Sequence, residues 1–490
     1  MLTRITKHDW LTAIECRTEA WFALREDADT PSEASLFRMK QGQEIGKLAH
    51  ELFTGGFLVR ADDGCTAAQA TAKLVAQETP SVLFEAAFES TALAARADIL
   101  ELQSDGWHVL EVKSSFSDTK SMSDLLDDLS YTVMVARRAG LLVTRASLVL
   151  LSRSYRFGDT PAELFEIVDK TVDAFKRADE FDRDAEELIK ALLGEDLPRP
   201  YLKSACRSCP YFGDRCLGNQ ATHTVFELPN LHYKKLQGLA ADGVVDLADL
   251  PPTLALTAIQ QRARDSALGN RVIVDSALGT ALKCIEWPCY YLDFETVATV
   301  LPLYQRHGCH QQVLTQFSVH ARDSLHDIPH HDEYLGDPSR DCQEDLAECL
   351  ILALRDKGSI IVYSHFEKQR ITELMRDYPH LAAPLQAILD RLLDLHPVIK
   401  NHIYHPGFSG SFSLKKVLPA LVPAVSYDGL DIADGDSAIT MFARMARGEI
   451  IGEEAVRTKR SLLEYCKLDT LAMVKLHDVL AEMADKDSAT

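Results

Sequence analysis

Three charged side chains in the first quarter of the chain have the types and the spacing of a metal-dependent hydrolytic site. Asp98 lies in the run RADIL, and Glu111 and Lys113 lie two residues apart in LEVKSS. Residues two apart on a strand project from the same face, and a hairpin through the turn at 104–106 would place the strand of Asp98 alongside. Two carboxylates can hold a divalent metal ion while the ammonium orients or activates water. This pattern predicts hydrolysis that depends on Mg²⁺ or Mn²⁺.

The simpler interpretation of this group is a solvated ion pair on an edge strand, because charged side chains are mostly exposed. The neighbouring runs ADILEL and WHVLEV are largely apolar, so both carboxylates would be half-buried, which is costly without a partner. His50, one helical turn after Gly46 in GKLAH, can add an imidazole ligand that favours Mn²⁺. Glu85 in FEAAF is a further candidate for the metal shell.

A second acidic group is predicted in the last region of the chain. Asp293 and Glu295 in YYLDFETV are two apart on a predicted strand and face one way. Tyr465 and Asp469 in EYCKLDT are four apart, which is about one helical turn. Carboxylates from a strand and a helix can hold two divalent metals ~4 Å apart, which activate water and stabilise the leaving oxygen. Tyr465 would orient the attacking water.

The middle acid of this second group has two candidates. Glu367 follows the predicted strand SIIVYS, and Asp394 lies in RLLDLHPVI. We favour Glu367, because the carboxyl ends of parallel strands meet at one edge of a sheet, whereas Asp394 would cap or brace the next segment. Lys415 and Lys416 follow the flexible run GFSGSFS, where they either contact phosphates or begin an ordinary solvated helix.

Three of the eleven cysteines lie close together in sequence. Cys206, Cys209 and Cys216 supply three thiolates from one turn-rich loop, and Cys16 in IECRTEAWF is the best fourth ligand. Thiolates suit an iron–sulfur cluster or Zn²⁺, and the spacing does not choose between them. The alternative is unrelated thiols with Cys16 buried as a small apolar residue. We favour a metal, because clustered thiols without one are reactive, and a metal would staple a very long loop.

Composition excludes several classes of protein. The 490 residues are 46% hydrophobic and 26% charged, which is ordinary for a globular chain. No apolar run approaches the ~20 residues of a membrane span, and the first residues lack the pattern of a signal peptide. We therefore expect a cytoplasmic protein with reduced thiols and no membrane partner. The net charge of −21 argues against nucleic-acid affinity over the whole surface, but a local basic groove remains compatible with it.

The chain divides into three predicted segments of an α/β protein. Residues 1–220 contain helical patterns and strand-like runs, and end in the cysteine loop. Residues 221–285 contain short helices joined by turns and form a connector. Residues 286–490 alternate strands with helices, which indicates an α/β sheet.

The order of motifs in the first segment, from GKLAH through FEAAF, RADIL and EVKSS to a helix with a tyrosine, resembles the RecB-like branch of the PD-(D/E)XK nucleases. Tyr131 lies where that family places the tyrosine, usually four residues after a glutamine, and Asp127 stands in the glutamine's place. The resemblance implies a restriction-endonuclease-like domain. It also implies catalytic or metal-binding roles for Tyr131 and for His50, Glu85, Asp98, Glu111 and Lys113.

Two further resemblances concern the cysteines and the last segment. Three clustered cysteines with a distant N-terminal partner resemble the iron–sulfur nucleases of CRISPR adaptation and the AddB helicase–nuclease, which implies a [4Fe–4S] cluster. The D-x-E strand with a late Y-x3-D helix resembles the DEDD exonucleases of the RNase H-like fold, with glutamate at position 367 where aspartate is usual. The stretch after Asp394 looks like an uncharacterised bacterial family in which such a domain follows a RecB-like nuclease.

Together these patterns predict a nuclease with two sites in one chain, most simply an exonuclease. DNA, either single-stranded or bearing ends, is the first-choice substrate, and RNA stays open. Roles in repair, recombination or defence are implied by resemblance alone. One alternative is a nucleic-acid-binding scaffold with one or both sites inert. Another is a zinc-stapled hydrolase that acts on a different substrate.

Overall fold

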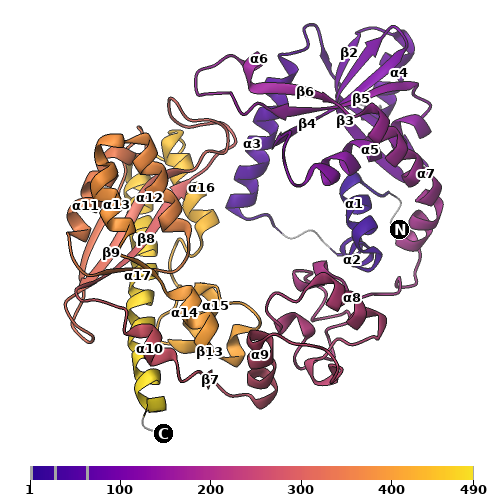
Figure 1. Cartoon of the computed structure of the whole chain (residues 1–490). Coiled ribbons are helices and arrows are strands. Elements are labelled where there is room, and N and C mark those ends of the chain that lie inside the picture. Colours follow the sequence, from indigo (N-terminus) through magenta and orange to yellow (C-terminus); the bar gives the residue numbers. More distant parts are fainter. Residues whose placement is uncertain (1–3, 27–29, 62–65, 489–490) are drawn as a thin grey trace. The chain divides into compact units, whose positions relative to one another are not determined.

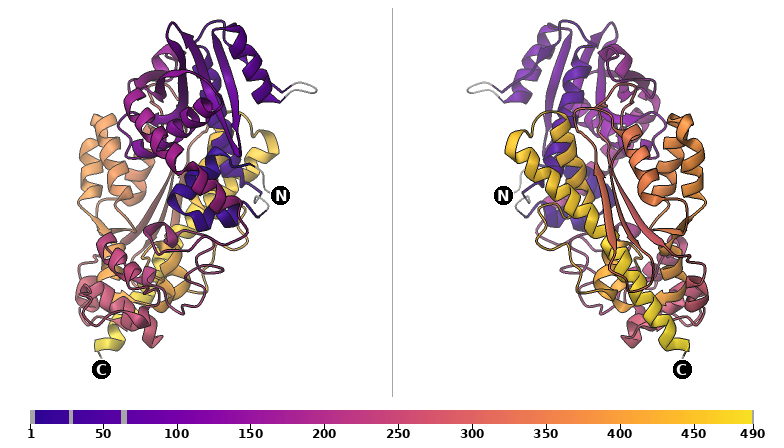
Figure 2. Two further views of the ribbon diagram at one scale, coloured as in Figure 1. Left: turned by 90° about the vertical axis from the view of Figure 1, so that its right-hand side faces the viewer. Right: turned by 90° about the vertical axis from the view of Figure 1, so that its left-hand side faces the viewer.

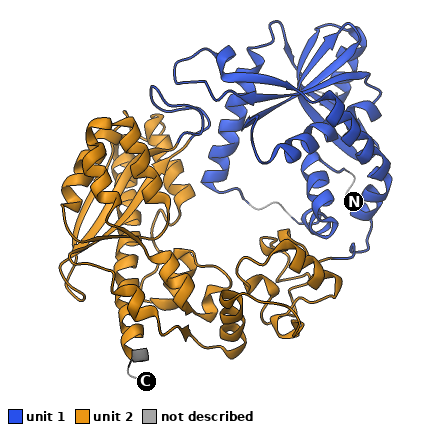
Figure 3. Cartoon of the chain, in the orientation of Figure 1, with its two compact units in different colours: residues 1–200, 299–311 blue, residues 201–298, 312–490 orange. Residues whose placement is uncertain are grey.

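The structure is a computed structural model that describes residues 4–26, 30–61 and 66–488. The chain forms two compact units (Figure 3). Unit 1 contains residues 1–200 and 299–311, and unit 2 contains residues 201–298 and 312–490. This division differs from the three segments expected from the sequence, which remain a hypothesis about domain organisation.

Unit 1 is built on a six-stranded mixed sheet with the order β1-β2-β3-β4-β5-β6 (Figure 1). The strands are β1 (Phe57–Leu58), β2 (Val82–Ser90), β3 (Leu93–Gln103), β4 (Gly106–Phe116), β5 (Val143–Leu151) and β6 (Phe165–Asp169). β2, β3 and β4 form an antiparallel meander, β4 and β5 are parallel, and β6 is antiparallel to β5. The hairpin expected at 104–106 joins β3 to β4, and Gly106 is in the left-handed region with φ +141°. A Cβ at Gly106 would lie 2.8 Å from the carbonyl oxygen of Leu142, so the turn requires glycine.

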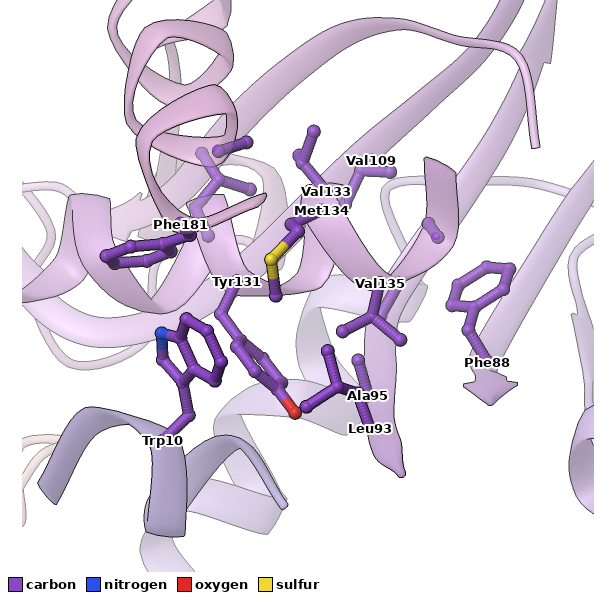
Figure 4. Packing of buried hydrophobic residues seen from close by; sticks show 14 of the residues in the cluster. Trp10, Phe88, Leu93, Ala95, Val109, Tyr131, Val133, Met134, Val135 and Phe181 are labelled. Atoms are coloured by element: carbon purple, nitrogen blue, oxygen red, sulfur yellow. The ribbon is translucent and has the colours of Figure 1, made fainter. Parts of the chain in front are cut away.

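Helices cover both faces of this sheet. They are α1 (Lys7–Glu15), α2 (Arg17–Ala23), α3 (Glu33–His50), α4 (Ala67–Gln77), α5 (Met122–Arg138), α6 (Pro161–Leu164) and α7 (Thr171–Leu193). α5 supplies the crossover that the parallel pair β4–β5 requires. On its side of the sheet, Trp10 packs against Tyr131 and Phe181, with both pairs of ring centroids 5.5 Å apart (Figure 4). On the opposite face, Ile45 and Ala49 of α3 join a second apolar cluster.

Unit 2 contains a five-stranded mixed sheet with the order β10-β9-β8-β11-β12. The strands are β8 (Cys289–Val297), β9 (Val313–Arg322), β10 (His330–Leu335), β11 (Ser359–Val362) and β12 (Leu392–Asp394). β8, β9 and β10 are antiparallel, whereas β11 and β12 run parallel to β8. A separate antiparallel pair joins β7 (Ile273–Val274) to β13 (Ile403–Tyr404).

The α-helices of unit 2 lie partly on the two faces of this sheet and partly outside it. They are α8 (Tyr233–Ala241), α9 (Ala258–Gly269), α10 (Leu278–Leu282), α11 (Gln343–Leu354), α12 (Phe366–Asp377), α13 (Ala382–Leu389), α14 (Leu395–His402), α15 (Leu414–Leu421), α16 (Gly435–Ala446) and α17 (Gly452–Ser488). The long α17 lies on one face and α11, α12 and α13 lie on the other (Figure 2). Tyr290, Leu292 and Phe294 of β8 pack with α11–α13, and Tyr291 packs with α17. Because side chains alternate along a strand, Asp293 and Glu295 share the face of Tyr291 and α17.

Residues 201–257 fold mainly through turns and short 3₁₀ helices. The 3₁₀ helices of the chain are η1 (Ser204–Arg207), η2 (Val225–Glu227), η3 (Leu247–Asp249), η4 (Pro379–Leu381) and η5 (Pro406–Phe408). Leu202, Phe212 and Phe226 anchor an apolar cluster here, to which Cys206 belongs. Among the described helices of the whole chain, none is long and apolar enough to cross a membrane.

Candidate active sites

The structure brings together the three residues of the first acidic group. Glu111 of β4 is only 1% exposed, and Lys113, two residues further on the same strand, places its Nζ 3.4 Å from Glu111 Oε2. The β3–β4 register runs up to the pair Ile99–Leu110, so Asp98 and Glu111 are the next residues along. The Asp98 carboxylate accepts a hydrogen bond of 2.7 Å from the backbone N–H of Val112. Alternation along two adjacent strands therefore produces this cluster.

Two more charged residues complete the cluster. Lys7 Nζ lies 2.9 Å from Glu111 Oε1 and 2.9 Å from Asp128 Oδ2. Lys113 Nζ lies 2.7 Å from the same Asp128 oxygen. Lys7, Glu111, Lys113 and Asp128 thus form a closed ring of ion pairs, and the hydroxyl of Thr132 donates a further bond of 2.6 Å to Glu111 Oε1.

Local structure explains the position of both added residues. Ile5 is fully buried and pairs with Leu93 at the start of β3, and a reciprocal capping box between Thr6 and Asp9 begins α1. Lys7 is therefore held in the first turn of a fixed helix. On α5, Asp128 and Thr132 are four residues apart, so they share one helix face, and that face packs against β4.

Burial and charge set the protonation of the ring. Burial raises the pKa of Glu111 to about 7; Asp98 and Asp128 act in the same direction, and the two lysines oppose them. Burial opposes the positive charge of Lys7 and Lys113, yet the surrounding carboxylates raise the pKa of each lysine. Against the effect of burial, both lysines lower the pKa of Asp128. The lysines are therefore protonated near neutral pH and act as hydrogen-bond donors, which fits orientation of water better than its deprotonation.

His50 ends α3, on the opposite side of the sheet from α5. Its ring stacks on Phe84, with ring centroids 3.9 Å apart. Burial lowers the pKa of His50, and its Nε2 is buried with no hydrogen-bond partner among the described residues. A neutral imidazole with an unpartnered nitrogen fits a metal ligand.

Glu85 lies at an irregular point of β2. The β2–β3 register pairs Phe84 with Ile99 and Ala86 with Ala97, which places Glu85 opposite Asp98. Its backbone is left-handed with φ +57°, and its Oε2 lies 3.4 Å from the guanidinium of Arg96. Glu85 is therefore next to the acidic strand pair, but its observed partner is an arginine.

Tyr131 does not join the carboxylates. It is fully buried in the apolar core between Trp10 and the start of β3 (Figure 4), and its hydroxyl donates to the backbone carbonyls of Ile5 and Ala94, each at 3.2 Å. Burial raises the pKa of Tyr131. The tyrosine thus lies on the core-facing side of α5, away from the carboxylates, and its catalytic role stays a prediction. Asp127, in the place of the family's glutamine, pairs instead with Arg177 at 2.6 Å.

The second acidic group also assembles, in unit 2. Asp293, Glu295 and Asp469 each present a carboxylate oxygen within 4.8 Å of the other two. Burial raises the pKa of Asp293 well above its usual range, with Asp469, Glu295 and Glu367 acting in the same direction. Burial likewise raises the pKa of Glu295 to about 8 and that of Asp469 to about 6, although Lys415 opposes both shifts. Three like charges in a buried position are the arrangement that a divalent cation stabilises.

Glu367 and Asp394, the two candidates for the middle acid, differ in their surroundings. Glu367 lies in the first turn of α12, which follows β11; it is 3% exposed and accepts a hydrogen bond of 3.2 Å from Ser364. Burial raises the pKa of Glu367 to about 7, and its charge raises the pKa of Asp293. Asp394 caps α14 by accepting a bond of 2.8 Å from the N–H of His396. Glu367 therefore lies close enough to Asp293 to raise its pKa, while Asp394 caps α14 and itself raises the pKa of Glu367.

Aromatic and thiol groups surround Asp469. The hydroxyl of Tyr427 donates to Asp469 Oδ1, a contact for which the sequence gives no periodic signal. Tyr465 is 4% exposed and its ring lies 6.0 Å from that of Tyr427, while burial and then Asp469 raise its pKa. Cys466 Sγ lies 3.5 Å from Asp293 Oδ2. Tyr465 therefore borders the acidic group, as the spacing of four residues predicts.

The four cysteines lie in two different units. Cys206 is buried in η1, and Cys209 and Cys216 are half-buried in the turns that follow. Cys16 is 7% exposed at the junction of α1 and α2 in unit 1. The α2 helix is bonded to the segment that follows α7, because the Thr18 hydroxyl donates a hydrogen bond of 3.0 Å to the carbonyl of Pro198.

Comparison with known families gives two matches. Residues 57–216 match the PD-(D/E)XK nuclease superfamily, and residues 290–413 match a domain of unknown function, DUF2779. No curated protein matches the chain. The first match contains Asp98, Glu111 and Lys113 and ends at Cys216, whereas the second contains Asp293 but stops before Asp469. The first match indicates a metal-dependent phosphodiester hydrolase that acts on nucleic acid.

Proposed function

We propose that this protein is a metal-dependent nuclease and that its first site consists of Asp98, Glu111 and Lys113. The observation that carries this proposal is the meeting of two carboxylates and a protonated lysine on adjacent strands, inside the region that matches the nuclease superfamily. Asp98 and Glu111 would hold Mg²⁺ or Mn²⁺, which activates water and stabilises the leaving oxygen. His50, whose buried Nε2 has no partner among the described residues, is proposed as a further ligand from α3, although it lies on the opposite side of the sheet from α5, which Glu111 contacts.

In this mechanism the protein's own groups position the reactants. Lys113 donates hydrogen bonds, which orients the attacking water or a phosphate oxygen. Lys7 and Thr132 hold Glu111 in one rotamer by contacting its Oε1 at 2.9 and 2.6 Å. Glu111 and, second to it, Asp128 raise the pKa of both lysines and keep them protonated. A fixed first site reduces the entropy that must be lost on reaching the transition state.

The second site is proposed as a DEDD-type exonuclease centre on an RNase H-like domain. Asp293, Glu295 and Asp469 would hold two Mg²⁺ or Mn²⁺ ions together with Glu367, and Tyr465 would orient water. One support is that these carboxylates are buried with too few cations nearby to offset their negative charge. The other is a mixed sheet with helices on both faces, whose first strand carries D-x-E. DNA with single-stranded character or free ends is the proposed substrate of the protein, with RNA second.

A [4Fe–4S] cluster on Cys16, Cys206, Cys209 and Cys216 is proposed as a structural staple, with Zn²⁺ as the alternative metal. Chain connectivity supports it. α2, which begins after Cys16, bonds to Pro198, and the eight residues from there to Cys206 reach at most ~29 Å. The superfamily match also extends through the cysteine loop. Anaerobically purified protein should be brown and should absorb near ~400 nm, and Cys16→Ala should lose both the colour and the bound iron.

The direct test of nuclease function uses end-labelled DNA and RNA, each single- and double-stranded, with Mn²⁺ and with EDTA. The full-length protein should cleave at least one of them with Mn²⁺, and Lys113→Ala combined with Asp293→Asn should abolish cleavage. Cleavage that survives in the double variant would place the activity elsewhere.

The alternative of an inert first site rests on one observation, the closed ion-pair ring in which Lys7 already contacts two of the carboxylates. The single variant Asp293→Asn distinguishes an active first site from an inert one. If this variant still cleaves with Mn²⁺ and requires Lys113, the first site is active.

A further inference from the structure

A cavity of about 810 Å³ lies in unit 1 beside the first site. It is lined by Arg4, Lys7, Arg96, the first turn of α4 and the hairpin of β2 and β3. Its volume falls within the ~300–1,000 Å³ of small-molecule sites. Lys7 connects the two features, because the ammonium of this cavity-lining residue contacts both Glu111 and Asp128.

Small apolar residues line part of the cavity. They are Ala67, Ala68, Ala87, Ala94 and Ala95, with Phe88 among them. Phe88 and Ala95 are paired on the buried face of the β2–β3 hairpin, whereas Ala87 and Ala94 lie on its other face and are half-buried. Alanines leave room for a flat group to lie against them, and burying the face of such a group is favourable by ~25 cal/mol per Å².

The charged members of the lining are mainly cationic. They are Arg4, Lys7 and Arg96 with one carboxylate, Glu89, although the chain as a whole has 73 acidic and 52 basic residues. Lys7 is already paired with Glu111 and Asp128, so the two arginines are the cations available to a ligand. Arg4 lies 2.8 Å from Glu89, and Arg96 lies 3.4 Å from Glu85. Both arginine side chains are more than half exposed, at 57% and 60%, and such pairs contribute only ~0–1 kcal/mol. A phosphate can therefore displace either carboxylate at small cost.

We propose that this cavity binds an unpaired nucleotide of a single-stranded nucleic acid, next to the phosphodiester that the first site hydrolyses. The assignment rests on the proposed nuclease function. Proteins hold single strands by combining a surface on which a base can lie with cations that meet the backbone, and this cavity has both. A duplex keeps its bases stacked and paired, and it offers mainly phosphates and groove edges. It has no free base to fill a nucleotide-sized apolar space.

Photocrosslinking tests the location directly. The full-length protein is mixed in EDTA with a single-stranded oligonucleotide that carries 4-thiothymidine, irradiated, and the crosslinked peptides are mapped by mass spectrometry. Crosslinks should map to residues 66–69, 87–89 and 94–96. An unlabelled single strand should compete for them, and a blunt hairpin duplex should not.

Three variants sharpen the test. Arg4→Gln with Arg96→Gln removes two cations and should lower the crosslinking yield roughly tenfold. Ala67→Leu fills the cavity from the first position of α4, where leucine suits the helix, and should lower the yield by a similar factor. Arg145→Gln is the matched control, since Arg145 is an exposed arginine of the same sheet, 3.1 Å from Asp169 and not part of the lining. It should keep the full yield.

The outcomes separate this proposal from the nuclease function. Equal yields in the Arg4/Arg96 and Ala67 variants, at unchanged melting temperature, overturn the cavity proposal, as do crosslinks confined to other segments. Cleavage by the wild-type protein would then leave the nuclease function standing. Cavity crosslinks in a protein that cleaves no substrate with any divalent ion would support the binding site and overturn the nuclease function.

Discussion

In the first site Glu111 contacts two lysines. In the second site Asp293, Glu295 and Asp469 lie together, and Lys415 opposes the pKa shifts of Glu295 and Asp469 without restoring their usual values. Both sets of carboxylates are buried, so both carry a desolvation cost. The first site offsets that cost with its own ammonium groups. In the second site, the desolvation cost must be offset by protonation of the carboxylates or by bound cations. The stability of the region around the second site should therefore depend on metal and on pH far more than that around the first site.

The largest expected effect concerns the middle acid of the second site. Glu367→Gln should reduce cleavage by this site about as strongly as Asp293→Asn, on the order of 10³-fold, because each removes a negative charge that the metals need. Asp394→Asn is the matched control and should cost far less, since Asp394 caps α14. Rates are measured with Mn²⁺ in the Lys113→Ala background. If Asp394→Asn abolishes cleavage while Glu367→Gln cleaves at a near-normal rate, Asp394 is the middle acid and Glu367 is not.

Lys113→Ala should remove the activity of the first site by roughly 10²-fold or more while the protein stays folded, since its ammonium is the positioned donor next to Glu111. Cleavage is measured in the Asp293→Asn background, with circular dichroism as the folding check. Lys120→Ala, an exposed lysine nearby in the sequence, should behave like the parent. Parent-level rates in Lys113→Ala would mean that the lysine does no chemistry.

Lys7→Met should make the stability of the first site depend on bound metal, as we expect for the second site. Removing one cation leaves Glu111 and Asp128 with Lys113 alone, and we expect a loss of ~1–3 kcal/mol in the free energy of unfolding. Mn²⁺ should then restore more stability in this variant than in the wild type. Urea titrations with and without Mn²⁺ measure both quantities, and the exposed Lys176→Met is the control. Equal stabilities would show that the ring contributes nothing to the fold.

The smallest expected effect is the pH dependence of stability without metal. The folded-state pKa values of Glu295, Glu367 and Asp469 are raised to about 8, 7 and 6, so these groups hold protons that the unfolded chain releases near pH ~4. Their contribution is full below that pH and is lost as the pH rises through the raised values. In EDTA the melting temperature should therefore fall between about pH 5 and about pH 8.5, and Mg²⁺ should flatten the curve. Glu295→Gln should also flatten it; an unchanged slope would contradict the assigned cause.

Local periodicity was enough to predict the parts of each site that lie on one strand or one helix. Glu111 with Lys113, and Asp293 with Glu295, follow from an alternation of two, and Tyr465 with Asp469 follows from a spacing of four. The meeting of Asp98 with Glu111 also followed, because a tight turn joins their strands.

Contacts between distant segments were not predictable in the same way. Lys7 is 104 residues from Glu111, and nothing in the residues around it indicates that contact. Asp128 is one of three acids in SMSDLLDDLSYTV, and only the packing of α5 on β4 distinguishes it from Asp127. The same holds for Tyr131, because a shift of one helix position decides whether its side chain faces the carboxylates or the core.

The segment 299–311 follows the strand of Asp293 and Glu295 in the sequence, but it belongs to unit 1. The N–H of Val300 bonds to Gln41 of α3 at 2.7 Å, and His310 Nε2 lies 2.6 Å from the carbonyl oxygen of Ser114 on β4. Cys309 is buried in the apolar cluster beneath α3. Any gene fragment that ends before residue 299 therefore encodes a nuclease-like half without a piece of its own core. The two halves are consequently poor candidates for separate expression or for exchange between homologues, and they should be inherited as one unit.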